Sequence, residues 1–174
     1  MRYIVLLRGV NVGGNHKVVM KELREKVVHL GYSSVSTYLN SGNLLFESQE
    51  SPKEICDKIE SLFIESYDFD LPFLLKSEDE MKLIEKAIPT DWNNDTLYKT
   101  DVAYLFAQVD SQEIIERLPI KREYVDIHYV KGALFWRVER ENYSRSHLNK
   151  IHGDKLYKLM TVRNINTARI LAGK

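Results

Sequence analysis

The stretch RYIVLLRGVNVGG (residues 2–14) places a short apolar run directly before a glycine-rich loop. The run has the length of a β-strand. Apolar residues then recur at helical spacing, and Gly31 follows as a helix stop signal. These apolar residues are Met20, Leu23, Val27 and Leu30. The beginning of the chain therefore predicts a strand, a polar loop and an amphipathic helix, in that order.

The residues up to 76 extend this pattern to a complete α+β unit. Residues 35–39 and 43–47 predict two strands around a turn at 40–42. Residues 51–54 form a capping box with proline at the first helical position, so a second helix begins there. Residues 71–75 predict a closing strand. Strand, helix, strand, strand, helix, strand is the ferredoxin-like order, which we assign to a subdomain of residues 1–76.

The second half repeats much of this order and predicts a second α+β subdomain at residues 77–174. Its expected elements are a helix at 77–88, a strand at 101–107, a short helix before Pro119, a hairpin at 124–139, a mostly helical stretch at 144–160 and a last helix at 164–171. A closing strand is missing from this prediction. The expected fold class is α+β, with two ferredoxin-like subdomains and a C-terminal helical segment.

Composition places the chain among ordinary globular proteins. Its 174 residues are 44% hydrophobic, and no apolar run is long enough to cross a bilayer. No cleavage site follows the first apolar run, so we expect a cytoplasmic protein without membrane contact. Cys56 is the single cysteine, which excludes an internal disulfide and argues against a thiolate zinc site. The histidines lack metal-binding spacing, and the sequence predicts no metal site and no cofactor.

Charge is distributed unevenly along a chain whose formal net charge is zero. Residues 1–46 carry a net +4 and residues 137–174 a net +6, whereas residues 47–100 carry −8 and residues 101–136 carry −2. If the basic ends meet in space, they form a locally positive surface. The alternative is that solvated faces simply differ in charge.

The glycine-rich loop is the first candidate ligand-binding cluster. A junction between a strand, a glycine-rich loop and a helix offers backbone N–H groups to an anion, and Arg8 can fork onto a phosphate or carboxylate. Asn15 and His16 stand where a P-loop requires Lys and Ser or Thr, which excludes that type of ATP site. The alternative is a loop that only needs positive φ, with Arg8 in a structural ion pair. The candidate residues are Arg8, Gly9, Asn11, Gly13, Gly14 and Lys17.

Two further polar clusters complete the candidate site. Ser41, Gly42 and Asn43 lie in a predicted hairpin turn, and no nucleophile elbow or neighbouring base supports Ser41 as a nucleophile. The catalytic residues, if any, stay unknown. The other cluster precedes and opens the last predicted helix, where Asn164 or Thr161 is expected to cap. Arg163 would lie unfavourably at the positive end of that helix, which an anion would relieve. Its predicted ligand-binding residues are Arg163, Asn164 and Thr167.

Taken together, three motifs resemble the domain-of-unknown-function family 1697. They are residues 6–14 with Lys17 and Met20 behind them, residues 37–43, and residues 163–167. The resemblance covers nearly the whole chain. It implies a bacterial, soluble α+β protein with two ferredoxin-like halves and no assigned activity.

The chain departs from the usual pattern of this family at three positions. The family has Ile, Gln and often Trp where this sequence has Val10, Asn40 and Ile165. The change at Val10 is conservative. Asn40 shortens a polar side chain, and Ile165 removes an aromatic ring, so both changes weaken a base-stacking role.

Three functions compete at this point. The first is a pocket for a small anionic ligand, with Arg8, Asn11, Lys17 and Arg163 around one concave surface. The second is nucleic-acid binding through a ferredoxin-like sheet, although residues 42–46 lack the aromatic pattern of RNA-binding sheets. The third is a non-catalytic interaction module such as a homodimer, which an exposed apolar strand face would favour.

Overall fold

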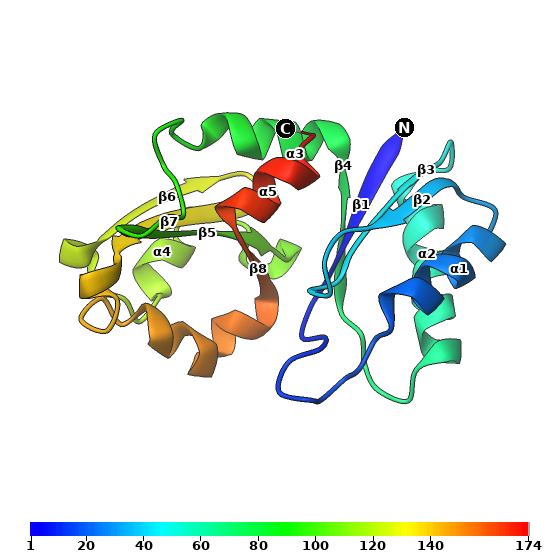
Figure 1. The fold of residues 1–174 in the computed structure, drawn as a ribbon, viewed down its shortest axis with the longest axis horizontal. Helices are drawn as coiled ribbons and strands as arrows, with labels where there is room; N and C mark the ends of the chain where they lie inside the picture. Colours follow the sequence, from blue (N-terminus) through cyan, green and yellow to red (C-terminus); the bar gives the residue numbers. More distant parts are fainter. Residues whose placement is uncertain (174) are drawn as a thin grey trace. The chain divides into compact units, whose positions relative to one another are not determined.

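The computed structural model describes residues 1–173, which form two compact units (Figure 1). The first unit comprises Met1–Glu78, and the second begins at Asp79. Each unit contains one four-stranded antiparallel sheet together with helices. The predicted α+β fold class with two similar subdomains is therefore confirmed.

The first unit has the βαββαβ order expected from the sequence. Its elements are β1 (Arg2–Leu7), α1 (Met20–His29), β2 (Ser33–Thr37), β3 (Asn43–Glu47), α2 (Pro52–Ser66) and β4 (Phe73–Ser77). The strand order in the sheet is β2-β3-β1-β4. This arrangement places β1 between two partners in the middle of the sheet.

One core holds the helices of the first unit against its sheet. Residues 3–7 of β1 are all buried, and every second one, namely Tyr3, Val5 and Leu7, lies in the same cluster as residues of α1 and α2. Burial of each large apolar side chain of this kind stabilises the fold by about 1.5–3 kcal/mol. The helix α2 begins with the predicted capping box, in which Ser51 and Glu54 bond reciprocally. The capping box and the apolar periodicity therefore both predict the helix α2 that the structure contains.

The second unit has the same strand order with different covering elements. Its elements are α3 (Glu78–Ala87), which starts at the boundary, β5 (Tyr98–Leu105), α4 (Ile114–Arg117), β6 (Val125–Val130), β7 (Ala133–Glu139), β8 (Met160–Asn164) and α5 (Ile165–Leu171). The sheet order is β6-β7-β5-β8. Since β5 takes the central place of β1 and β8 the edge place of β4, this sheet is also ferredoxin-like.

Two predictions for this half were wrong. The closing strand exists as β8, and the stretch 144–160 is not a regular helix but contains two 3₁₀ segments, Leu148–Gly153 and Lys155–Leu159. His147 adopts a left-handed φ of 62°, and the Asp154 side chain caps the second segment, so the helical pattern is interrupted twice. The residues after this stretch then pair with β5 instead of continuing a helix.

The two sheets correspond residue by residue. Tyr3 of β1 pairs with Phe46 and Ser77, and Asp101 of β5 pairs in the same way with Trp136 and Asn164. This correspondence makes Asp101 the structural counterpart of Tyr3.

The far ends of the central strands match as well. The backbone N–H of Leu7 donates to the carbonyl of Gly42 at 2.8 Å, and that of Leu105 donates to Gly132 at 2.9 Å. Both glycines have positive φ, of 87° and 89°. The repeat suggested by the sequence therefore extends to individual backbone contacts.

Candidate functional site

The loop between β1 and α1 has an unusual backbone. Five of its residues adopt φ between 49° and 78°: Gly9, Asn11, Gly13, Gly14 and His16. Within it, the backbone N–H of Asn11 donates to the carbonyl of His16 at 3.2 Å, and that of Asn15 donates to Val12 at 3.1 Å. These two N–H groups are therefore bonded within the loop. Backbone stretches that contain left-handed residues can bind anions through their remaining N–H groups.

The side chain of Asn11 holds this loop in shape. Its amide nitrogen donates to the carbonyls of Val18 at 3.0 Å and Asn40 at 2.8 Å, and its oxygen accepts from the N–H of Val18 at 2.9 Å. Both amide hydrogens are therefore engaged with backbone oxygens. Asn11 fixes the loop to the segment before β3 and so joins the first two polar clusters of the sequence.

The second cluster is closely packed against β1. The buried Asn43 side chain donates to the carbonyl of Tyr38 at 2.7 Å and to the hydroxyl of Ser41 at 3.1 Å. A Cβ on Gly42 would lie 2.6 Å from Cβ of Leu7 and 2.9 Å from Cγ2 of Val10. Gly42 is therefore required both for its positive φ and for the close approach of the two segments. Ser41 itself is exposed.

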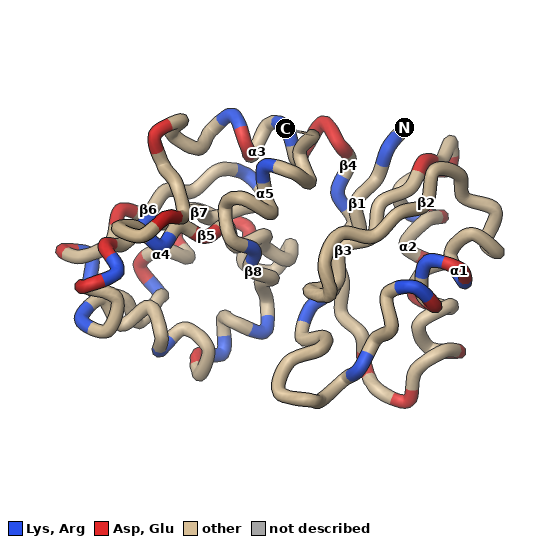
Figure 2. Tube along the Cα trace, in the orientation of Figure 1, with Lys and Arg blue, Asp and Glu red and all other residues tan. Residues whose placement is uncertain are grey.

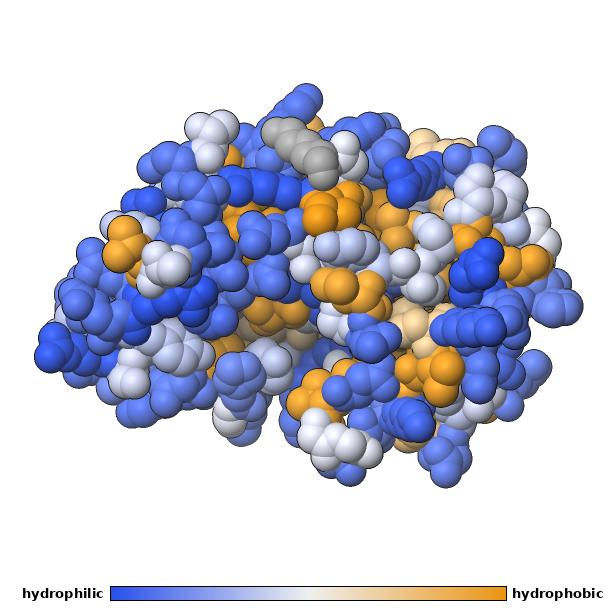
Figure 3. All heavy atoms as spheres, in the orientation of Figure 1, coloured by the Kyte–Doolittle hydropathy of each residue, from blue (hydrophilic) through white to orange (hydrophobic). Residues whose placement is uncertain are grey.

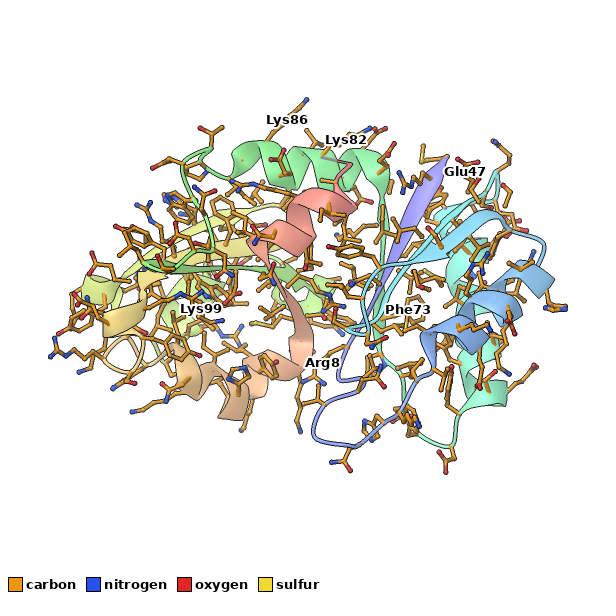
Figure 4. The ribbon with its side chains drawn as sticks, in the orientation of Figure 1. Arg8, Glu47, Phe73, Lys82, Lys86 and Lys99 are labelled. Carbon is orange, nitrogen blue, oxygen red and sulfur yellow. The ribbon has the colours of Figure 1, made fainter. Side chains whose placement is uncertain are left out.

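Two cations lie at the ends of the loop, and the residues between them carry no Lys, Arg, Asp or Glu (Figure 2). Arg8 directly follows β1, is half-buried and donates its backbone N–H to the carbonyl of Pro72 at 2.9 Å (Figure 4). Lys17 is exposed and stands just before α1. The N-cap residue of α1 is Val19, whose side chain makes no capping hydrogen bond. Positive charge and a helix N-terminus without a side-chain cap therefore occur in one loop.

The third cluster lies in the second unit, at the junction of β8 and α5. Of the two predicted caps of the last helix, Thr161 and Asn164, it is Asn164 whose side-chain oxygen accepts from the backbone N–H of Thr167, at 2.9 Å. Arg163 belongs to β8 and is buried, and its guanidinium donates to Thr161 Oγ1 at 2.8 Å and to the carbonyl of Val162 at 2.9 Å. Burial lowers the pKa of Arg163 to about 10. Figure 2 shows further basic residues along the segment that leads to β8.

The structure thus brings the first two clusters together within the first unit. The third cluster belongs to the second unit. That Arg8, Asn11, Lys17 and Arg163 share one concave surface stays a prediction.

A polar cluster that the sequence analysis did not single out lies on β5. Lys99 Nζ is 3.2 Å from Asp101 Oδ2, and the Asp101 side chain is 9% exposed. The sequence did contain a signal for this cluster. Lys99 and Asp101 are two residues apart in a mostly apolar strand, so their charged side chains share one face of the sheet. Among the described residues, no group of three or more His, Cys, Asp or Glu side chains is arranged to hold a metal ion. Nor does any described helix combine the length and hydrophobicity that a membrane span requires.

Comparisons with known proteins give a family and a fold. A family model described as "Protein of unknown function (DUF1697)" matches residues 1–136. The conserved bacterial protein SP0830 from Streptococcus pneumoniae has a similar structure, with 31% sequence identity and a TM-score of 0.87. The similarity covers 98% of this chain and 96% of that one. A comparison with curated proteins found no match.

Proposed function

The chain belongs to the DUF1697 family of unknown function, and from its own residues we propose that the loop at residues 8–19 binds a small anion bearing a phosphate or carboxylate. The observation that carries the proposal is the loop's backbone, which is left-handed at five positions and leads into a helix without a side-chain cap. Such a loop can present several N–H groups to one anion.

The candidate residues take different roles in this proposal. Gly9, Gly13 and Gly14 allow the anion to approach the backbone, because no atoms would surround a Cβ at these positions. Arg8 and Lys17 supply positive charge at the two ends of the loop. Asn11 shapes the loop, and Ser41, Gly42 and Asn43 support it from β3.

Arg163, Asn164 and Thr167 remain predicted ligand-binding residues in the second unit. Their part in the proposal depends on whether they act on the same ligand as Arg8, which the variant Arg163→Ala tests.

The two alternatives have less support. RNA-binding sheets of this type carry aromatic residues on the face away from the helices, whereas β1 and β3 place Ile4, Leu6 and Leu45 there, none of which is aromatic. A homodimer through an apolar strand face would need exposed apolar strand residues. Among residues 1–173, none of the large exposed apolar side chains lies on a β-strand, and apolar residues alternate with hydrophilic ones on the face in Figure 3.

Titration with inorganic phosphate and pyrophosphate, followed by amide chemical shifts, tests the proposal. We expect saturable shifts at Gly9, Gly13 and Gly14. Arg8→Ala, Lys17→Ala and Arg163→Ala should each weaken binding by about 1.5–3 kcal/mol, the range for hydrogen bonds to charged groups. Lys53→Ala is the matched control, since Lys53 is exposed on α2 and pairs with Asp57.

The wild-type titration decides the outcome. Absence of shifts in the loop amides at saturating phosphate would overturn the proposal. Equal affinities of the Arg8 and Lys17 variants and the Lys53 control would assign the loop to a structural role. An effect of Arg8→Ala without one of Arg163→Ala would restrict the site to the first unit.

A further inference from the structure

The second unit contains a pocket of about 240 Å³ between its sheet and the 3₁₀ segments. All of its lining residues belong to the second unit, so it is separate from the proposed anion-binding loop. The floor is formed by β5, β7 and β8, where Asp101 pairs with Trp136 on one side and Asn164 on the other. Cross-strand partners point to the same face of a sheet, so these side chains converge at one end of the pocket.

An ion pair with one buried partner forms the polar end of the pocket. Lys99 lies two residues before Asp101 and therefore on the same face, and Figure 4 shows it on the side of the 3₁₀ segments. Its Nζ is 3.2 Å from Asp101 Oδ2. The Asp101 side chain is 9% exposed and the Lys99 side chain 34%, so the lysine lies nearer to solvent. Burial raises the pKa of Asp101, while the nearby Lys99 ammonium opposes this shift by favouring the charged form.

Aromatic rings form much of the wall. They belong to Trp136, Tyr143, His152 and Tyr157. Lys99 Nζ lies 5.7 Å from the centroid of the Tyr143 ring, and the His152 and Tyr157 rings meet edge to face at 4.8 Å. Flat apolar walls of this kind favour a planar ligand.

We propose that this pocket binds a small, neutral, planar ligand with an adjacent hydrogen-bond donor and acceptor, such as a carboxamide on an aromatic ring. Its donor would bond to the Asp101 carboxylate and its acceptor to the Lys99 ammonium. A carboxylate offers about four acceptor positions and an ammonium three donors. The contact of Asp101 Oδ2 with Lys99 Nζ leaves acceptor positions of the carboxylate for a ligand.

The neutrality of the ligand follows from the pair itself. A cationic ligand placed against Asp101 would also approach the Lys99 ammonium, and an anionic ligand placed against Lys99 would approach the buried carboxylate. Each would meet a like charge at short range in a partly desolvated site, where repulsion is strong. A neutral amide satisfies both groups without this penalty.

Four probes with one shared ring test the proposal: benzamide, methyl benzoate, benzoate and benzylammonium. Binding is read from the indole N–H signal of Trp136 in ¹H–¹⁵N spectra. The other tryptophan, Trp92, is assigned with the variant Trp92→Phe. We expect a saturable shift of the Trp136 signal with benzamide. Methyl benzoate, which lacks the donor, and both charged probes should bind at least about tenfold more weakly.

Two variants then test the polar end. Asp101→Asn and Lys99→Met should each weaken benzamide binding by about tenfold or more, the fold-change for loss of a hydrogen bond to a charged group. Lys155→Met is the control, because Lys155 is an exposed residue of the second 3₁₀ segment.

Several results would overturn the proposal. They are an unchanged Trp136 signal at saturating benzamide, tighter binding of either charged probe, or wild-type affinity in both variants. If a variant fails to fold, the probe series on the wild-type protein decides alone.

Discussion

The strands β1 and β5 occupy the same central place in two sheets of the same strand order, yet their core-facing residues differ. Tyr3, the first of these residues in β1, is aromatic and packs near Phe46 with ring centroids 6.2 Å apart. Its counterpart in β5 is the carboxylate Asp101, which lies opposite Trp136 in the sheet and 3.2 Å from Lys99 Nζ. The ferredoxin-like topology therefore does not determine whether the residue at the position of Tyr3 and Asp101 packs in an apolar core or lines a pocket.

The covering layers explain the difference. In the first unit, the 15-residue helix α2 contributes the buried residues Ile55, Ile59 and Phe63 to one continuous core. In the second unit, three short 3₁₀ segments stand at the corresponding place in the chain, between the third and fourth strands: Arg140–Asn142, Leu148–Gly153 and Lys155–Leu159. Short 3₁₀ segments present side chains less regularly than an α-helix. A carboxylate paired with a lysine is accommodated beneath such a layer.

Placing the side chain of Asp101 at the position of Tyr3 should cause the largest loss of folding stability. Tyr3→Asp places a carboxylate in an apolar core where Met1, rather than a lysine, stands two residues earlier. We expect a loss of at least about 4 kcal/mol, because a buried charge without a partner and a lost aromatic side chain both destabilise. Denaturant unfolding monitored by circular dichroism measures the loss. Tyr3→Phe is the control, and a cost below about 1 kcal/mol for Tyr3→Asp would contradict our comparison.

A smaller effect is expected at the shared glycine of the two sheets. Gly42→Ala combines positive φ with a Cβ only 2.6 Å from Cβ of Leu7, so we expect a loss of about 2–4 kcal/mol. Gly14→Ala, with positive φ but open space, should lose about 1–2 kcal/mol. Thermal and denaturant unfolding of both variants measure these losses. The difference between the two losses gives the cost of the steric contact, and the loss in Gly14→Ala gives the cost of the backbone conformation. Equal losses would mean that the contact with Leu7 relaxes freely.

The smallest effect concerns the pH dependence of the second unit. Because the folded-state pKa of Asp101 is raised by burial, the folded protein holds its proton to higher pH than the unfolded chain does. The contribution of Asp101 to stability is therefore largest below its unfolded pKa and is lost as pH rises through its folded pKa. We expect Asp101→Asn to gain stability relative to wild type over this rise. Unfolding measured from about pH 3 to 7 checks the sign, and a relative gain on acidification would contradict it.

The sequence alone determined the features that depend on neighbouring residues. The capping box at Ser51, the cap at Asn164 and the hairpin turn at Gly132 each follow from local hydrogen bonding or from a local backbone requirement. Apolar periodicity added the helices α1 and α2 and the βαββαβ order of elements along the first unit. These interactions span a few residues, so their signals lie within short windows of sequence.

Features that depend on distant partners could be known only from the folded protein. The strand β8 was missed because its pairing with β5 overrides the helical pattern that precedes it. The engagement of the Asn11 amide depends on Asn40, and the burial of Asp101 depends on Trp136 across the sheet. Strand register and side-chain burial depend on which distant segments pack together. Short windows of a single sequence do not contain that information.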